Sequence, residues 1–232
     1  MATRVGTPVT FSDDSGGSAT HSTAAKSTTT GNTLILVVKW EIGVGAQTLS
    51  SVSDTAGNSW SIITQQNYGG TGEPRVALCY ATNITGNASN VVTVTFSNSN
   101  ATFSRGICEE FSGLATASVL DGSAQSNTGT TADYSTSNIT TAQAGLVVLG
   151  VGDYSGLTNH TGTPGTPDFS VGGTVSDTAF FYYISSSAQT ITPGAGADGN
   201  TQWVAIAQAF KDAASSTAVP VFYNHLRTQG IA

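Results

Sequence analysis

Short apolar runs, separated by clusters of glycine, asparagine, aspartate and serine, recur along the whole chain and constrain the fold more than any other feature. The runs at 34–40 (LILVVKW), 91–96 (VVTVTF) and 145–151 (GLVVLGV) are rich in β-branched residues and too short for typical helices. No segment repeats apolar residues at helical spacing over more than two turns. The sequence therefore predicts an all-β protein.

The predicted strands occur twice in the same order. The run that begins at Leu34 matches the run that begins at Leu146, and the segment ending at Phe111 matches the one ending at Phe210. Two four-stranded halves of like order predict a jelly-roll-like β-sandwich built from two similar Greek-key halves. The alternative is a resemblance by composition alone, since the chain is rich in valine, threonine and glycine. Residues 119–134 are expected to connect the halves.

The ends of the chain differ from this body. Residues 1–30 are expected to hold a short first strand and a polar arm, and residues 213–232 a linker and a C-terminal tail. Residues 31–212 would form the sandwich, with halves at about 31–113 and 144–212. Because exposed aromatic side chains favour association, the tail would either fold back onto the sandwich or pair with a neighbouring sheet edge. Its candidate partner-binding residues are Val221, Phe222, Tyr223, His225, Leu226 and Arg227.

Charge excludes one class of partner. Only 9% of the 232 residues are charged, and the formal net charge is −7. A nucleic-acid-binding protein needs a basic patch to neutralise phosphates, and seven lysines and arginines are too few to form one. A membrane helix would need about 20 consecutive apolar residues, which the sequence lacks. We also expect no secretory signal peptide, because residues 1–12 contain no apolar stretch of the required length.

Residues suited to catalysis are sparse. None of the three histidines (His21, His160 and His225) lies in a pattern with a nucleophilic serine motif. Glu109 and Glu110 are adjacent on a predicted strand, so they point to opposite faces and cannot form the carboxylate pair of a glycosidase. We therefore predict that the protein is not an enzyme and has no catalytic residues.

Metal-binding and cysteine patterns are equally weak. Cys79 and Cys108 are too few for a disulfide framework or a zinc site, and we expect two buried free thiols. Calcium would suit the oxygen-rich loops, with Asp198-Gly199-Asn200 as the candidate site. The same tripeptide also suits a tight hairpin turn, and no regular Asp-x-Asp-x-Asp spacing supports the metal. We predict no metal and no cofactor.

Aromatic residues near loops provide candidates for sugar binding. Trp60 and Tyr68 flank a glycine-rich loop at 68–72 (YGGTG), where their rings could stack on a pyranose. Tyr134 and Tyr154 are the next candidates. For Trp60 the alternative is a place in the hydrophobic core. The sequence thus allows a glycan platform at Trp60 and Tyr68.

Four segments together resemble a known family. The segments 53–60 (SDTAGNSW), 78–81 (LCYA), 92–96 (VTVTF) and 110–114 (EFSGL) follow one another in an order similar to jelly-roll domains of structural proteins of tailed-phage virions and of bacterial surface proteins. The resemblance covers about residues 31–211 and brings no catalytic residue with it.

This resemblance implies a non-catalytic virion structural protein, either a capsid decoration (cement) protein or a fibre component. Such a protein would assemble in the host cytoplasm, bind other virion subunits such as the major capsid protein, and often form a homo-oligomer, for instance a trimer. The hydrophobic tail would then be its anchoring peptide. The alternative function is a carbohydrate- or receptor-binding module of a fibre or cell-surface protein, with Trp60 and Tyr68 as its platform.

Overall fold

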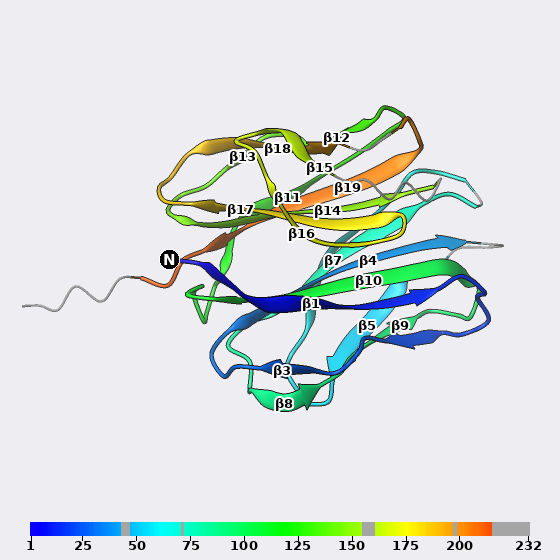
Figure 1. Ribbon diagram of the computed structural model, residues 1–232, viewed down its shortest axis with the longest axis horizontal. Coiled ribbons are helices and arrows are strands. Elements are labelled where there is room, and N and C mark those ends of the chain that lie inside the picture. Colours follow the sequence, from blue (N-terminus) through cyan, green and yellow to red (C-terminus); the bar gives the residue numbers. More distant parts are fainter. Residues whose placement is uncertain (43–46, 71, 155–160, 197–198, 215–232) are drawn as a thin grey trace, which may run out of the picture.

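The computed structural model describes residues 1–42, 47–70, 72–154, 161–196 and 199–214, and these residues form antiparallel β-sheets, which confirms the predicted all-β sandwich class. Two five-stranded sheets pack face to face at the centre, and smaller sheets cover their outer faces, so the molecule has four layers (Figure 1). Among the described residues, none belongs to a helix that is long and apolar enough to cross a membrane.

The first half supplies the lower two layers of Figure 1. Its large sheet has the strand order β1-β10-β4-β7-β6, and its outer sheets have the orders β2-β9-β5 and β3-β8. The strands are β1 (Thr3–Asp13), β2 (Thr20–Ser22), β3 (Lys26–Thr28), β4 (Thr33–Ile42), β5 (Leu49–Asp54), β6 (Ser61–Asn67), β7 (Arg75–Ala81), β8 (Asn87–Asn90), β9 (Val92–Phe96) and β10 (Ala101–Ser112).

The second half supplies the upper two layers. Its large sheet has the order β11-β19-β14-β17-β16, and β18 pairs with β12, β13 and β15 to form the outer layer. The strands are β11 (Leu120–Gly129), β12 (Asp133–Ser135), β13 (Ile139–Thr140), β14 (Gly145–Asp153), β15 (Thr161–Thr166), β16 (Ser170–Val175), β17 (Thr178–Ser185), β18 (Thr190–Gly196) and β19 (Trp203–Lys211).

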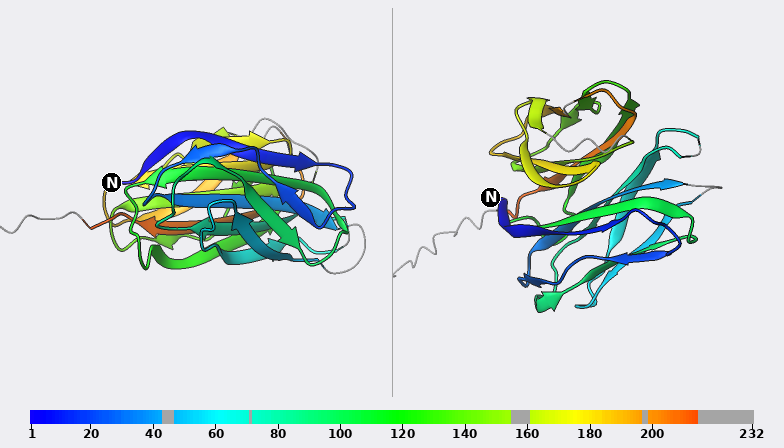
Figure 2. Two further views of the ribbon diagram at one scale, coloured as in Figure 1. Left: turned by 90° about the horizontal axis from the view of Figure 1, so that it is seen from below. Right: turned by 45° about the vertical axis from the view of Figure 1, so that its right-hand side comes forward.

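The two large sheets have the same topology. Replacing β1, β10, β4, β7 and β6 by β11, β19, β14, β17 and β16 converts one strand order into the other. Each half forms its own pair of layers, whereas the sequence predicted that two four-stranded halves would share one sandwich (Figure 2). The chain is thus built from two sandwiches of like design, packed through their large sheets.

Two segments that the sequence did not assign to the sheets complete this symmetry. Residues 119–134, expected to connect the halves, contain β11, which pairs with β19 in the same way that β1 pairs with β10. Residues 13–31, expected to be a polar arm, contain β2 and β3. Because β11 is a half-exposed edge strand held by backbone hydrogen bonds, it carries few of the apolar residues that mark a buried strand.

The register between the halves differs by one residue from the predicted match. Phe111 lies opposite Thr33, and Phe210 lies opposite Leu146, so Leu146 corresponds to Thr33 and Leu34 to Val147. A shift by one residue moves every side chain of a strand to the other face. The sequence could not reveal this shift, because β4 and β14 are buried on both faces and lack an alternating pattern.

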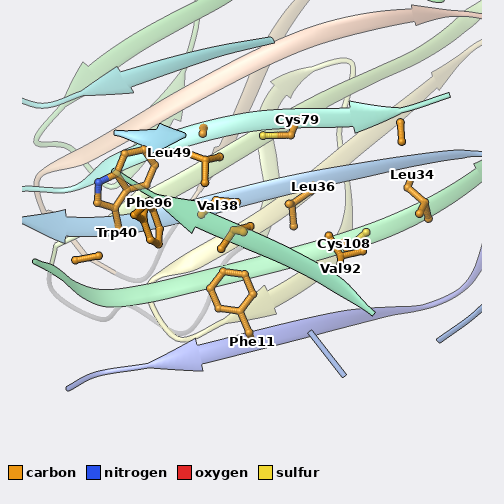
Figure 3. Packing of buried hydrophobic residues seen from close by; sticks show 14 of the residues in the cluster. Phe11, Leu34, Leu36, Val38, Trp40, Leu49, Cys79, Val92, Phe96 and Cys108 are labelled. Atoms are coloured by element: carbon orange, nitrogen blue, oxygen red, sulfur yellow. The ribbon is translucent and has the colours of Figure 1, made fainter. Parts of the chain in front are cut away.

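Apolar side chains fill all three spaces between the four layers. Trp40, Phe96 and their neighbours pack inside the first half in what we call the first-half cluster (Figure 3). Cys79 and Cys108 lie in this cluster as buried free thiols, which confirms the prediction for both cysteines. The central cluster joins the two halves through residues including Ile35, Val37, Ile107, Phe111, Leu146, Val148, Phe180, Ile206 and Phe210.

The first strand and the last strand meet at one end of the molecule. The backbone N–H of Ala2 donates a hydrogen bond of 2.6 Å to Oδ1 of Asp212, just beyond β19. Strands β4 and β14 both run away from this end and finish at the opposite one, as the views in Figures 1 and 2 show. The opposite end therefore collects the loops that follow β1, β4 and β14.

Candidate functional site

The structure places Trp60 and Tyr68, the predicted glycan platform, against two different clusters. Trp60 is half-buried, donates its indole N–H to Oδ2 of Asp54 at 3.1 Å, and packs against the first-half cluster. Tyr68 is half-buried against the central cluster, on the other face of the same large sheet. Of the two further candidates, Tyr134 is buried and donates its hydroxyl to Asp153 at 3.0 Å, whereas Tyr154 is exposed.

Other predicted residues fall where the structure makes no statement. The tail residues Val221 to Arg227 and the calcium candidate Asp198 lie outside the described residues. Within the described part of the chain, no group of three or more histidine, cysteine, aspartate or glutamate side chains is arranged to hold a metal ion.

A pocket of about 390 Å³ opens at the seam between the two halves, at the end where β1, β4 and β14 finish. We call it the seam pocket. The first half contributes the end of β1, the end of β4 and the start of β10, and the second half contributes the residue after β14 and the turn between β16 and β17. Charged and aromatic side chains dominate its lining, namely Asp14, Glu41, Phe103, Arg105, Tyr154 and Asp177.

A buried lysine ties the two halves together beneath this pocket. Lys39 Nζ donates to Oε1 of Glu41 at 2.5 Å and to Oδ2 of Asp177 at 2.6 Å, and the lysine side chain is fully buried. Burial raises the pKa of Glu41 above its ordinary value, and the nearby Lys39 ammonium opposes this effect without cancelling it. One cation from β4 therefore holds one carboxylate of its own half and one of the other half.

A second buried cation lies beside the first. Arg105 donates from Nη2 to Asp14 and from Nη1 to the backbone oxygen of Asp13 at 3.0 Å. Its Nε atom lies 3.5 Å from Oδ1 of Asp177. Asp14 itself is largely exposed, with 72% of its side chain accessible, so the network runs from the buried Lys39 to the surface of the pocket.

Two exposed aromatic rings complete the lining of the pocket. Phe103 is 43% exposed and Tyr154 is 51% exposed, and they are two of only four large hydrophobic residues that are exposed in the described part of the chain. Phe103 also has a left-handed backbone, with φ at +47°, which costs a non-glycine residue roughly 1–2 kcal/mol. Its ring lies 5.9 Å from Lys39 Nζ. Neither the exposure of this ring nor the strain of its backbone stabilises the fold, so Phe103 is a candidate for contact with a ligand.

The second half provides an internal comparison for the buried charges. Arg105 lies opposite Lys39 on β10 and β4, and the corresponding pair on β19 and β14 is Val204 opposite Gly152. The same backbone arrangement therefore forms without charges at these positions. Because a buried ion pair is often no more stabilising than apolar side chains of similar volume, the network at Lys39 is not explained by folding alone.

Sequence reasoning named Tyr154 among its secondary sugar-binding candidates and missed the other residues of the seam pocket. A usable signal was present at Lys39, the one charge in the apolar run 34–40 that was predicted to be covered on both faces. A lysine in such a strand needs a buried partner of opposite charge. No pattern in the sequence identifies that partner as Asp177, which comes from the other half.

The chain was also compared with known proteins. No protein-family model, no curated protein and no solved structure matches it.

Proposed function

We propose that this protein is a non-catalytic carbohydrate- or receptor-binding module whose ligand enters the seam pocket. The observation that carries the proposal is the pairing of two exposed rings, Phe103 and Tyr154, with the carboxylates of Asp14, Glu41 and Asp177 around one cavity. Aromatic rings pack against the apolar C–H face of a sugar, and carboxylate oxygens accept hydrogen bonds from its hydroxyl groups.

The charge balance narrows the ligand class. Three carboxylates face two buried cations, Lys39 and Arg105, so the network has an excess of one negative charge. Such a surface disfavours uronic and sialic acids and suits a neutral or amino sugar. A pocket of about 390 Å³ is large enough for one or two sugar units.

The same contacts favour binding over hydrolysis. A glycosidase needs one carboxyl group that releases a proton and a second that attacks or activates water. Here both Glu41 and Asp177 bind the ammonium of Lys39, at 2.5 and 2.6 Å. A carboxylate whose oxygen is bonded to an ammonium is not free to attack the sugar or to activate a water molecule.

Glycan-array screening followed by calorimetric titration of the bound sugar tests the proposal. We expect Tyr154→Ala and Phe103→Ala to weaken binding at least about tenfold while the melting temperature stays near that of the parent. Val171→Ala is the matched control, because it removes an exposed apolar side chain (42% accessible) that does not line this pocket.

Two results would contradict this assignment. If Trp60→Ala or Tyr68→Ala no longer binds the glycan while Tyr154→Ala still does, the binding site is the platform that the sequence predicted. Absence of any retained glycan or host-cell receptor for the parent protein would remove the proposed function altogether.

The virion structural role is the second candidate, and the placement of the chain ends favours it. Asp212 contacts Ala2 at the end opposite the seam pocket, so an attachment through residues beyond 214 would leave the pocket accessible. We expect deletion of residues 215–232 to abolish occupancy on capsids or to lower the oligomer mass. Unchanged assembly of the 1–214 chain would contradict an anchoring role for Val221 to Arg227.

A further inference from the structure

A second, smaller cavity of about 130 Å³ lies at the edge of the first half, next to β6 and β7. Trp40, Gln47, Gln65 and Arg75 are among its lining residues. Trp40 and its neighbour Glu41 point to opposite faces of β4, because successive side chains alternate along a strand. This cavity is therefore on the first-half-cluster side of the sheet, separate from the seam pocket, and a ligand bound in it would be independent of the proposed function.

Three of the side chains that line this cavity each have a buried polar atom without a hydrogen-bond partner in the described part of the chain. The atoms are Nε1 of Trp40, Nε of Arg75 and Oε1 of Gln47. Buried polar atoms are nearly always paired, because an unpaired one loses its hydration and gains nothing in return. Three such atoms at one cavity indicate that their partner comes from outside the protein.

Arg75 supplies an uncompensated positive charge. None of the ion pairs found among the described residues includes Arg75. Glu73, two positions earlier in the chain, accepts a hydrogen bond from Gln202. Burial lowers the pKa of Arg75, with no neighbouring charge that opposes the shift. A guanidinium group remains charged even so, and a desolvated one favours an anion.

Gln47 supplies an acceptor rather than a third donor. Its Nε2 atom donates to the backbone oxygen of Asn98 at 2.6 Å, and this bond fixes which end of the amide carries the oxygen. Gln65 holds the edge of the cavity in place, because its amide exchanges two hydrogen bonds with the backbone of Leu49, of 2.9 and 2.8 Å. The cavity thus offers two fixed donors and one fixed acceptor.

We propose that this cavity binds a small oxyanion that carries its own hydroxyl group, such as inorganic phosphate or an α-hydroxycarboxylate. Oxygen atoms of the anion accept from Trp40 and Arg75, and its hydroxyl donates to Gln47. Both forms of phosphate present near neutral pH have at least one hydroxyl. Sulfate has a similar size but no hydrogen to donate, so it leaves Gln47 Oε1 unpaired. A volume of about 130 Å³ is that of about four liquid-water molecules, enough for one such group.

The three tryptophan side chains allow a direct test by ¹H–¹⁵N NMR. The indole N–H of Trp60 is bonded to Asp54, and that of Trp203 is bonded to the backbone oxygen of Thr131, so only the N–H of Trp40 is free to respond. Trp40→Phe assigns its signal. During titration with phosphate at constant ionic strength, we expect the Trp40 signal to move downfield in a saturable manner while the other two stay in place.

Matched probes and variants separate specific binding from general charge effects. We expect phosphate to bind more tightly than sulfate, and glycolate more tightly than acetate. Arg75→Gln should weaken phosphate binding at least about tenfold, whereas Lys211→Gln, which makes the same change in net charge away from the cavity, should leave it unchanged.

The site is supported if phosphate and glycolate shift the Trp40 signal in a saturable manner and both bind more weakly to Arg75→Gln. The relative affinities of the two anions then show whether the site prefers an inorganic or an organic anion. Should Arg75→Gln fail to fold, Gln47→Glu places a carboxylate beside Arg75 and is expected to abolish phosphate binding. The proposal is overturned if the Trp40 signal does not respond, if chloride moves it equally, or if sulfate binds as tightly as phosphate.

Discussion

The ring of Tyr80 packs edge-on against the ring of Phe210 across the seam, with centroids 5.9 Å apart and planes at 73°. Tyr182 makes the same contact with Phe111 in the reverse direction, at 5.6 Å and 66°. Tyr80 lies opposite Ile35 and Tyr182 lies opposite Val148, which occupy corresponding positions on β4 and β14. The contact between the halves is therefore reciprocal, as in a symmetric homodimer.

This reciprocity predicts equal coupling energies in the two aromatic pairs. Double-mutant cycles with leucine at Tyr80 and Phe210, and at Tyr182 and Phe111, should each give a coupling of about 0.5–1.5 kcal/mol in urea unfolding. The physical reason is that each cycle removes the same edge-to-face contact between corresponding strands. A coupling confined to one pair would show that the halves meet asymmetrically.

Removing the cation below the seam pocket should destabilise the protein strongly. Lys39→Met leaves Glu41 buried without its partner and Asp177 with Arg105 as its remaining cation, and we expect a loss of about 3–5 kcal/mol at pH 7. Without the Lys39 ammonium, burial raises the pKa of Glu41 further in the folded variant. The loss of stability should therefore be smallest below pH 4.5, where Glu41 is protonated in both proteins. It should grow as the pH rises through the raised pKa values of Glu41 in the two folded proteins.

The triple variant Lys39→Met, Glu41→Gln and Asp177→Asn is the matched control for that experiment. It removes the charges of Lys39 and of both its partners, while Arg105 keeps its contact with Asp14. In the second half the position that matches Lys39 is the uncharged Gly152. Urea unfolding should recover much of the lost stability. A triple variant as unstable as Lys39→Met alone would mean that the charges are needed for folding, contrary to the internal comparison.

Asp54 should stabilise the fold in a pH-dependent way. Burial alone would raise the pKa of Asp54, but hydrogen bonds from Asn58, Asn90 and Trp60 outweigh it and hold the pKa below its ordinary 3.8. Asp54→Asn should therefore cost about 1–3 kcal/mol at pH 7. The difference from the parent should stay constant above about pH 5 and shrink as the pH falls through 3.8 towards the lowered pKa of the folded state, as followed by thermal unfolding.

Phe103 should contribute to binding at the expense of stability. Phe103→Gly removes a strained left-handed backbone and an exposed ring, so the free energy of unfolding should stay within about 1 kcal/mol of the parent or rise. Phe111→Ala, which deletes a buried ring, should instead lose about 3–5 kcal/mol. A large loss of stability in Phe103→Gly would show that its ring is needed for packing.

The strands and their repetition could be read from the sequence because short apolar runs and turn residues mark them directly. The match between Leu34 and Leu146 was wrong by one residue, since strands covered on both faces have no alternation that fixes which side chains face the seam. The polar strand β11 was mistaken for a connection because an edge strand is specified by backbone pairing more than by side chains.

The candidate site was less predictable. Lys39 and Asp177 are 138 positions apart in the chain and meet only because the two large sheets stack. Local patterns do not encode such a contact. Trp60, for which the sequence left open a glycan platform or a place in the core, is half-buried and donates to Asp54.

The covalent linkage of two like halves determines how many seam pockets each molecule has. In a dimer of identical subunits, every feature beside the symmetry axis would appear twice, and a lysine on one side would face a lysine on the other. Within one polypeptide, Lys39 is matched by Gly152, so the two sides were free to diverge. Each molecule therefore has one seam pocket, and under the proposed function its avidity for a multivalent target would depend on how many molecules lie side by side.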